Sequence, residues 1–242
     1  MTLQQLKHLI NTHSIISFDV YDTLIMRKVL HPYDVFKIIG ETKAKKLNFD
    51  FFSERRRAEV ELRDYTDPDL YDIYSQMQQN TGMNDQTLQM LLDSEIEFEK
   101  NISVPRQCIV DLFNEIKKQK RVYLISDMHL PYQTIKDILT HAGIVGYEEL
   151  ILSNVYRTCK KHDLYRKYLD IVGQEACLHI GDNYKTDFLK PTEYGIDTFW
   201  IPSAYEIFSR KNTEFVEPTS MPQRCILSEK IINEYQNPFD NI

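Results

Sequence analysis

The fold of this chain follows from the stretch IISFDVYDTL at residues 15–24. Its first part, Ile15–Val20, is an apolar run of strand length. Strands that are buried on both faces of a parallel sheet read as such continuous runs. Asp19 and Asp22 lie at the end of the run, and ligands of open α/β sheets bind beyond the carboxyl ends of the strands. The stretch therefore predicts a buried strand that delivers carboxylates to a ligand site.

Four further apolar runs of strand length follow, at Val122–Ile125, Leu150–Leu152, Ala176–Ile180 and Thr198–Ile201. Segments with helical periodicity separate them. This alternation of strands and helices implies right-handed crossovers and a parallel sheet. We therefore expect an α/β fold with a doubly wound, Rossmann-like parallel sheet.

A gap of about a hundred residues separates the first two runs, which is far too long for one crossover connection. It shows no convincing strand, but it has helical patterns near Tyr33–Lys46, Phe52–Arg63, Pro68–Gln79 and Asp85–Lys100. We predict an inserted helical cap at residues 26–103 and a core made of residues 1–25 and 104–242. Within the core, residues 203–242 read as a Pro-containing tail with one helix around Leu227–Tyr235.

Composition indicates a soluble globular protein, because 27% of the 242 residues are charged and 42% are hydrophobic. The net charge of −7 argues against nucleic acid as the main partner. No run approaches the length of a membrane span and the N-terminus lacks a secretory pattern, so we expect a cytoplasmic protein without a membrane partner. The four cysteines lie far apart and are expected to be reduced thiols.

Polar side chains follow the predicted strands at the edge where the carboxyl ends of the strands meet. In chain order they are Asp19, Ser126, Asp127, Ser153, Asn154, Asp182 and Asn183, with Asp187 close behind. Like charges that are held close together cannot all ionise without a compensating cation. Oxygen ligands without Cys or His favour Mg²⁺ over zinc. The sequence therefore predicts a Mg²⁺ site at this edge.

Four segments resemble, in order, the four motifs of the haloacid dehalogenase (HAD) superfamily. They are Phe-Asp-Val-Tyr-Asp-Thr-Leu at 18–24, Leu-Ile-Ser-Asp at 124–127, Lys160 or Lys161, and Gly-Asp-Asn-Tyr-Lys-Thr-Asp at 181–187. The resemblance spans nearly the whole chain, and the insert lies where many family members carry a helical cap. Arg55-x-x-Ala58-Glu59 and the run at 95–99 are similar to predicted bacterial hydrolases that are often found near glycosyltransferases of surface polysaccharide synthesis.

The resemblance implies a Mg²⁺-dependent phosphatase. Asp19 would attack phosphorus and form an aspartyl phosphate that water then hydrolyses. The resemblance also implies that Mg²⁺ is held by Asp19, the backbone carbonyl of Tyr21, Asp182 and Asp187.

The family motifs also suggest which residues would contact the phosphate. Ser126, together with backbone N–H groups at the following helix start, would hold the phosphoryl oxygens, with Thr23 and Asp127 beside it. Lys160 would pair with the nucleophile and the phosphate, and Lys161 is the alternative.

Tyr21 departs from the pattern of the family's phosphatases, which usually carry at this position an Asp that protonates the leaving group. Haloacid dehalogenases carry Tyr there. General acid catalysis contributes about 10²–10⁴ in rate, so its loss would leave a slow phosphatase unless Asp22 supplies the proton. Dehalogenases need no metal, whereas Asp182 and Asp187 favour Mg²⁺ and phosphoryl transfer. The alternatives are a metal-independent 2-haloacid dehalogenase and a catalytically silent binding protein.

The cap is expected to close over the site and to select a small phosphorylated metabolite. A sugar, polyol or amino alcohol phosphate is the preferred class, on the resemblance alone. Arg55 is a candidate substrate contact, although its i, i+4 spacing to Glu59 also predicts a surface ion pair. His129 follows the second motif and is a candidate for the pocket lining, but we expect an exposed loop residue. The sequence predicts no oligomeric state.

Overall fold

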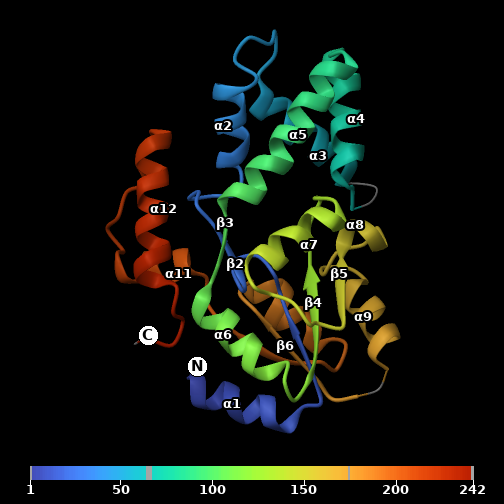
Figure 1. Cartoon of the computed structure of the whole chain (residues 1–242), viewed down its shortest axis with the longest axis vertical. Helices are drawn as coiled ribbons and strands as arrows, with labels where there is room; N and C mark the ends of the chain where they lie inside the picture. Colours follow the sequence, from blue (N-terminus) through green and yellow to red (C-terminus); the bar gives the residue numbers. More distant parts are fainter. Residues whose placement is uncertain (1, 64–66, 174, 241–242) are drawn as a thin grey trace.

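The computed structural model describes residues 2–63, 67–173 and 175–240. Its centre is a five-stranded sheet in the order β5-β4-β1-β6-β7, in which all neighbours are parallel. The strands are β1 (Ile15–Phe18), β4 (Arg121–Ser126), β5 (Glu149–Leu152), β6 (Cys177–Gly181) and β7 (Asp197–Trp200). Each corresponds to one of the predicted apolar runs. The predicted α/β fold with a parallel sheet is therefore confirmed (Figure 1).

Helices cover both faces of this sheet. On one face, α1 (Leu3–Thr12), α6 (Gln107–Ile116) and α7 (Tyr132–His141) share a hydrophobic cluster with Phe18 of β1. On the other face, α9 (Leu164–Val172) packs against Ile15 of the same strand. Burial on both faces explains why the strands read as continuous apolar runs. Within the described ranges, no helix combines the length and apolarity needed to cross a membrane.

The central position of β1 brings three strand ends together. Phe18 pairs with Leu124 of β4 on one side and with Ile180 of β6 on the other. The N–H of Asp19 donates to the carbonyl of Ile180 at 2.9 Å, so the pairing continues one residue beyond the strand. Three short elements follow β5 and β6 along the same edge: α8 (Ser153–Tyr156), the π-helix η1 (Tyr184–Leu189) and α10 (Lys190–Thr192).

The segment between β1 and β4 contains four helices at the top of Figure 1: α2 (Asp34–Thr42), α3 (Phe51–Arg63), α4 (Leu70–Thr81) and α5 (Asp85–Ile102). The four predicted helical patterns correspond to these helices. The chain enters and leaves the segment through a two-stranded antiparallel ribbon, β2 (Ile25–Arg27) and β3 (Ser103–Pro105). The sequence did not predict this ribbon, because three residues are too few to show an alternating pattern.

The tail forms two helices, α11 (Ala204–Lys211) and α12 (Met221–Tyr235), which pack beside β2. The sequence predicted only one, shorter helix. Its hydrophobic pattern was weak because the buried side chains of α12 are Arg224, Ser228 and Ile231 rather than an apolar stripe. Arg224 donates two buried hydrogen bonds to Asp34 Oδ2, at 3.0 and 2.9 Å. The tail therefore connects the sheet domain to the first residue of α2.

Candidate active site

Three carboxylates meet at the carboxyl edge of the sheet, as the sequence predicted. Asp19 follows β1, Asp182 follows β6 and Asp187 lies in η1. One ligand oxygen from each of the three lies within 4.8 Å of the other two. Asp19 and Asp187 are buried, with 6% and 1% of their surfaces exposed. This is a donor set of oxygens only, which suits a hard divalent cation such as Mg²⁺.

Lys160, rather than Lys161, reaches the carboxylates. Its Nζ atom donates to Asp19 Oδ1 and, at 2.6 Å, to Asp187 Oδ1. Lys160 is 3% exposed, whereas Lys161 is exposed on the surface. The loop before Lys160 is fixed from the second motif, because Asp127 Oδ1 accepts the Lys160 backbone N–H at 2.8 Å. Asp127 therefore positions Lys160 in addition to any contact that it makes with a ligand.

Asp187 is held by an extensive set of hydrogen-bond donors. Oδ1 lies 3.3 Å from the Tyr165 hydroxyl and 3.3 Å from His179 Nε2, in addition to Lys160, and Oδ2 accepts the Asn183 N–H at 3.0 Å. His179 is buried beside Asp187. Burial lowers the pKa of His179 and so favours the neutral form of its imidazole ring. Because a carboxylate can only accept, Nε2 carries the proton toward Asp187.

His179 and Tyr165 were missed by the sequence reasoning. His179 Nδ1 lies 2.9 Å from Ser17 Oγ on the neighbouring strand, so both of its nitrogens have partners. His179 could have been recognised as a site residue, because it is a histidine within an apolar strand that leads directly into the Asp182 motif. Tyr165 lies in a helix with ordinary amphipathic periodicity and carried no such indication.

The electrostatics of the cluster favour a cation. Burial raises the pKa of Asp19 to about 7, although Lys160 opposes the increase. Burial and repulsion from Asp22, Asp19 and Asp187 raise the pKa of Asp182 well above its usual range. Three carboxylates face a single ammonium group, which leaves negative charge that a divalent ion would neutralise. The residues present therefore fit Mg²⁺, and Asp19 and Asp182 are the candidates for direct ligands because each accepts fewer side-chain hydrogen bonds than Asp187.

Comparison with solved structures found the same architecture in several proteins. The HAD-hydrolase YfnB from Bacillus subtilis, in a structure bound to magnesium, is 16% identical, with 91% of this chain and 99% of YfnB covered and a TM-score of 0.54. The L-2-haloacid dehalogenase from Xanthobacter autotrophicus is 14% identical, with 85% of each chain covered and a TM-score of 0.55. The 2-haloacid dehalogenase from Pseudomonas syringae is 11% identical, with 92% and 99% covered and a TM-score of 0.58.

The chain has the HAD-like fold. Searches with protein-family models and among curated proteins found no match to this sequence. With sequence identities of 11–16%, the structural likeness establishes the fold, whereas the chemistry depends on the side chains at the site.

The turn after the first strand of this HAD-like fold is tightly folded. Asp22 has a left-handed backbone (φ 61°), a conformation that costs about 1–3 kcal/mol for a residue other than glycine. Its N–H donates to the Ile25 carbonyl at 2.6 Å. Thr23 Oγ1 donates to Asp182 Oδ1 at 3.3 Å, and Trp200 Nε1 donates to the backbone carbonyl of Asp182 at 2.5 Å. Thr23 and Trp200 therefore orient Asp182, and Trp200 was also missed by the sequence reasoning.

The Tyr21 side chain points into the β2–β3 ribbon. The Arg27 guanidinium lies 3.7 Å from the centre of its ring, and Arg27 Nε donates to Glu99 Oε2 at 2.9 Å. Burial and the Glu99 charge raise the pKa of Tyr21. Its hydroxyl is buried and has no hydrogen-bond partner among the described residues. The backbone carbonyl of Tyr21 is thus the part of this residue that suits the site, and a catalytic role for its side chain has no support here.

The second and third strand ends form one loop network beside the carboxylates. Ser126 is buried at the end of β4 and is 2% exposed. Ser153 Oγ accepts the Met128 N–H at 2.9 Å, and Asn154 Nδ2 donates to the Leu130 carbonyl at 2.9 Å. Ser153 and Asn154 therefore hold the loop that carries Ser126 and Asp127 toward α7.

The predicted i, i+4 ion pair between Arg55 and Glu59 is present, but it is buried, so its predicted place on the surface was wrong. Arg55 Nη1 donates to Glu59 Oε2 at 2.9 Å, and Nε and Nη2 donate to both oxygens of Glu95 at 2.9 and 2.8 Å. This engagement does not fit the predicted role of Arg55 as a substrate contact. His129 was also predicted wrongly, because its side chain is 15% exposed and Nε2 lies 3.2 Å from Glu95 Oε1. Arg55 therefore supports a contact between α5 and the second motif loop.

Proposed function

We propose that this protein is a Mg²⁺-dependent phosphatase that uses Asp19 as its nucleophile. The observation that carries the proposal is the cluster of Asp19, Asp182 and Asp187, in which the buried Lys160 ammonium group binds Asp19 and Asp187. Hydrolysis of a phosphate monoester needs a nucleophile, a positive environment for the phosphoryl oxygens and a means of neutralising charge. The cluster has a residue for each of these tasks.

Asp19 is the nucleophile in this proposal because it lies at the centre of the sheet edge and contacts Lys160. Burial raises the pKa of Asp19 to about 7, and the Lys160 charge opposes this increase and so favours the ionised form that attacks. Attack on phosphorus forms an Asp19–phosphate bond and breaks the bond between phosphorus and the leaving oxygen, which takes a proton from water and departs as the alcohol. A second water then hydrolyses the Asp19–phosphate bond, which releases inorganic phosphate and restores the carboxylate. Ser126 and the N–H groups at the start of α7 would bind the phosphoryl oxygens.

Asp19, Asp182 and the Tyr21 carbonyl would hold Mg²⁺, which would supply positive charge at the transferring phosphoryl group. Asp187 already accepts from four donors, so we expect it to bind the ion through water and to fix Lys160. The magnesium present in the YfnB structure supports the choice of metal.

We propose that residues 26–103 act as a cap that selects a small phosphorylated metabolite, such as a sugar, polyol or amino alcohol phosphate. Several polar contacts join this segment to the loops of the site, and one of them is the His129–Glu95 contact described above. The Leu70 N–H donates to the His129 carbonyl at 2.7 Å, and Arg157 Nη2 donates to Asp69 Oδ2 at 3.0 Å. A helical unit that contacts the motif loops can close over a small substrate and exclude water.

A second candidate function is a metal-independent 2-haloacid dehalogenase. It is favoured by Tyr21 at the position of the usual acid and by the haloacid dehalogenases among the structural neighbours. In that reaction Asp19 would displace halide from carbon. The position of Asp182 argues against it, because burial and the neighbouring carboxylates disfavour its ionised form unless a cation is bound.

The deciding experiment measures phosphate release from a panel of phosphorylated small metabolites, with Mg²⁺ and with EDTA. Wild type is compared with Asp19→Asn and with Asp93→Asn, an exposed carboxylate on α5 that serves as the matched control. Mg²⁺-dependent release that only Asp19→Asn abolishes supports the phosphatase. Halide release from 2-haloacids in EDTA, without phosphate release, supports the dehalogenase. Activity only on phosphopeptides would contradict the small-metabolite substrate.

A further inference from the structure

Arg106, which links β3 to α6, is one of the largest fully buried side chains in the described part of the molecule. Its guanidinium donates to three backbone carbonyls that come from distant parts of the sequence. Nη1 donates to Asp22 at 2.9 Å, Nη2 to Pro202 at 2.8 Å and Nε to Gln236 at 2.6 Å. Its own N–H donates to the Leu24 carbonyl at 2.8 Å. One side chain thus joins the first motif, the end of β7 and the end of α12.

This environment differs from that of the other buried arginines, Arg55 and Arg224, which bind carboxylates directly. Among the described residues, Arg106 donates side-chain hydrogen bonds to three carbonyl oxygens and to no carboxylate. Burial lowers its pKa, and nearby negative groups that include Asp182 and Asp22 act in the opposite direction. Burying a cation costs desolvation free energy, which its hydrogen bonds and its attraction to nearby negative groups must offset.

The geometry shows what the contact fixes. The Tyr21 carbonyl belongs to the peptide group that precedes Asp22, so rotation about the Asp22 N–Cα bond turns that carbonyl. Asp22 is held at φ 61°, an unfavourable value, by its N–H bond to Ile25 and by the Arg106 bond to its carbonyl. Without Arg106, the turn could relax and carry the Tyr21 carbonyl away from the carboxylates.

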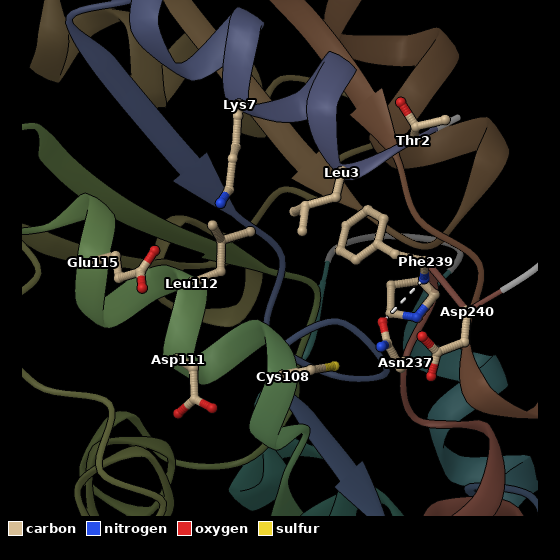
Figure 2. Close-up of a pocket in the computed structure, with 11 residues that line it drawn as sticks. Thr2, Leu3, Lys7, Cys108, Asp111, Leu112, Glu115, Asn237, Phe239 and Asp240 are labelled. Atoms are coloured by element: carbon tan, nitrogen blue, oxygen red, sulfur yellow. Dashed lines mark hydrogen bonds between the residues drawn. The ribbon is translucent and has the colours of Figure 1, made fainter.

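The far end of the contact is the C-terminal segment. The Gln236 carbonyl accepts hydrogen bonds from Arg106 Nε and, at 3.3 Å, from Cys108 Sγ. The Gln236 side-chain oxygen accepts the Gln107 N–H at 3.2 Å. Figure 2 shows Asn237 and Phe239 on the same side of α6 as Cys108, around a surface pocket. The end of α12 is therefore docked on the start of α6.

We propose that Arg106 is a positioning residue that fixes the Asp19–Asp22 turn and ties it to the C-terminal segment. The inference rests on the proposed function in one respect only, namely that the turn contributes the Tyr21 carbonyl to a Mg²⁺ site. Arg106 touches neither substrate nor metal, and it acts through the Asp22 carbonyl.

The first test measures amide hydrogen exchange of residues 19–25 in wild type, Arg106→Met, Arg106→Lys and Arg224→Met. Arg224→Met is the matched control, because it removes a buried tail arginine that bonds to Asp34 instead of the turn. Exchange in the turn should become at least about tenfold faster in both Arg106 variants and should stay at the wild-type rate in Arg224→Met. If Arg106→Met fails to fold, Arg106→Lys still tests the proposal, because lysine keeps the positive charge but lacks the planar guanidinium that donates to three carbonyls. An unchanged turn in the folded Arg106 variants would overturn the proposal.

The second test separates positioning from simple stabilisation. Mg²⁺ affinity by titration calorimetry and kcat for phosphate release should each fall by about 10- to 100-fold in the Arg106 variants, at temperatures where they are folded. Arg224→Met should keep both values. Equal losses in Arg224→Met would assign the effect to general destabilisation and overturn the proposal. If wild type neither binds Mg²⁺ nor releases phosphate, the proposed function fails, and the exchange result still decides the role of Arg106.

Discussion

Asp187 lies directly against the backbone of Gly181. A Cβ atom on residue 181 would be 2.5 Å from Asp187 Cβ and 2.9 Å from Asp187 Oδ2. The φ angle of Gly181 is not in the left-handed region, so the glycine is needed for space and not for backbone conformation. The close approach allows the π-helix to place Asp187 back over the end of β6, where it meets Lys160. Irregular helices of this kind are often found at functional sites.

Gly181→Ala should therefore displace Asp187 and weaken the Lys160 contact. We expect kcat to fall by about 10- to 100-fold, because the change misplaces a residue that supports the site. We also expect a loss of about 1–3 kcal/mol in the free energy of unfolding from overpacking. Steady-state kinetics and chemical denaturation measure the two effects. Gly40→Ala is the control, since its added Cβ would meet only Phe51 Cβ at 3.8 Å. It should keep the wild-type kcat, and because Gly40 lies within α2 it should raise the free energy of unfolding by up to about 1 kcal/mol.

Lys160→Met should reduce kcat by about 10²–10³, because a buried cation beside the reacting group stabilises charge in the transition state. It also leaves Asp19 and Asp187 without their shared partner. Lys161→Met changes the neighbouring, exposed lysine and should keep wild-type kcat. The pair is compared by phosphate release at saturating substrate. Equal losses in the two variants would contradict the assignment of Lys160.

Tyr21→Phe tests whether the tyrosine hydroxyl supplies a proton. The hydroxyl is buried without a partner among the described residues, so its removal should leave the free energy of unfolding unchanged within about 1 kcal/mol or increase it. We expect kcat to stay near the wild-type value, whereas loss of a true general acid would cost about 10²–10⁴. Kinetics across pH 5–9, a range of about four units around neutrality, would reveal such a loss. A decrease in kcat of that size would show that the Tyr21 hydroxyl acts as the general acid.

The sequence predicted the parts of this molecule that depend on local pattern. The five strands were visible because each is buried on both faces, and Asp19, Asp182 and Asp187 were visible because carboxylates at parallel strand ends meet in space. The sequence could not decide between the adjacent Lys160 and Lys161, and the structure shows that Lys160 contacts Asp19.

The parts that escaped prediction depend on contacts between distant residues. Arg55 and Glu95 are separated by forty positions, and nothing local shows that their helices bury both charges. Arg106 bonds to carbonyls, which every residue has, so no sequence pattern marks its partners. The ribbon β2–β3 is three residues long on each side, below the length at which alternation can be recognised.

The buried pair of Arg55 and Glu95 predicts an acid-sensitive contribution to stability. Burial raises the pKa of Glu95, but the Arg55 charge and the hydrogen bonds from His129 and Arg55 outweigh it and hold this pKa at about 2, from an ordinary value of 4.5. Because the folded pKa is depressed, the stabilisation is fully present above about pH 4.5 and is lost as the pH falls toward 2. The shift corresponds to roughly 3 kcal/mol of unfolding free energy.

Glu95→Gln should accordingly lower the free energy of unfolding at pH 7 by about 3–5 kcal/mol, because it leaves Arg55 with an incomplete buried partner. Below pH 4.5 the difference from wild type should shrink. Urea denaturation from pH 7 down to pH 3 measures both. Glu97→Gln, an exposed position on the same helix, should track wild type throughout. A constant difference between Glu95→Gln and wild type at all pH values would show that ionisation of Glu95 is not the source.

Asp182 provides a test of the metal site that does not depend on turnover. Without a cation, its charge is disfavoured by burial and by Asp22, Asp19 and Asp187, so Asp182→Asn should raise the melting temperature in EDTA. Mg²⁺ should stabilise wild type by about 2.7 kcal/mol when it is present at about 100 times its Kd, because it binds only the folded protein. The Asn variant loses a direct ligand and should gain almost nothing. Asp170→Asn, which changes an exposed carboxylate on α9, should respond to Mg²⁺ as wild type does. Thermal unfolding with EDTA and with increasing Mg²⁺ gives all of these values, and an Asp182→Asn protein that Mg²⁺ still stabilises fully would place the ion elsewhere.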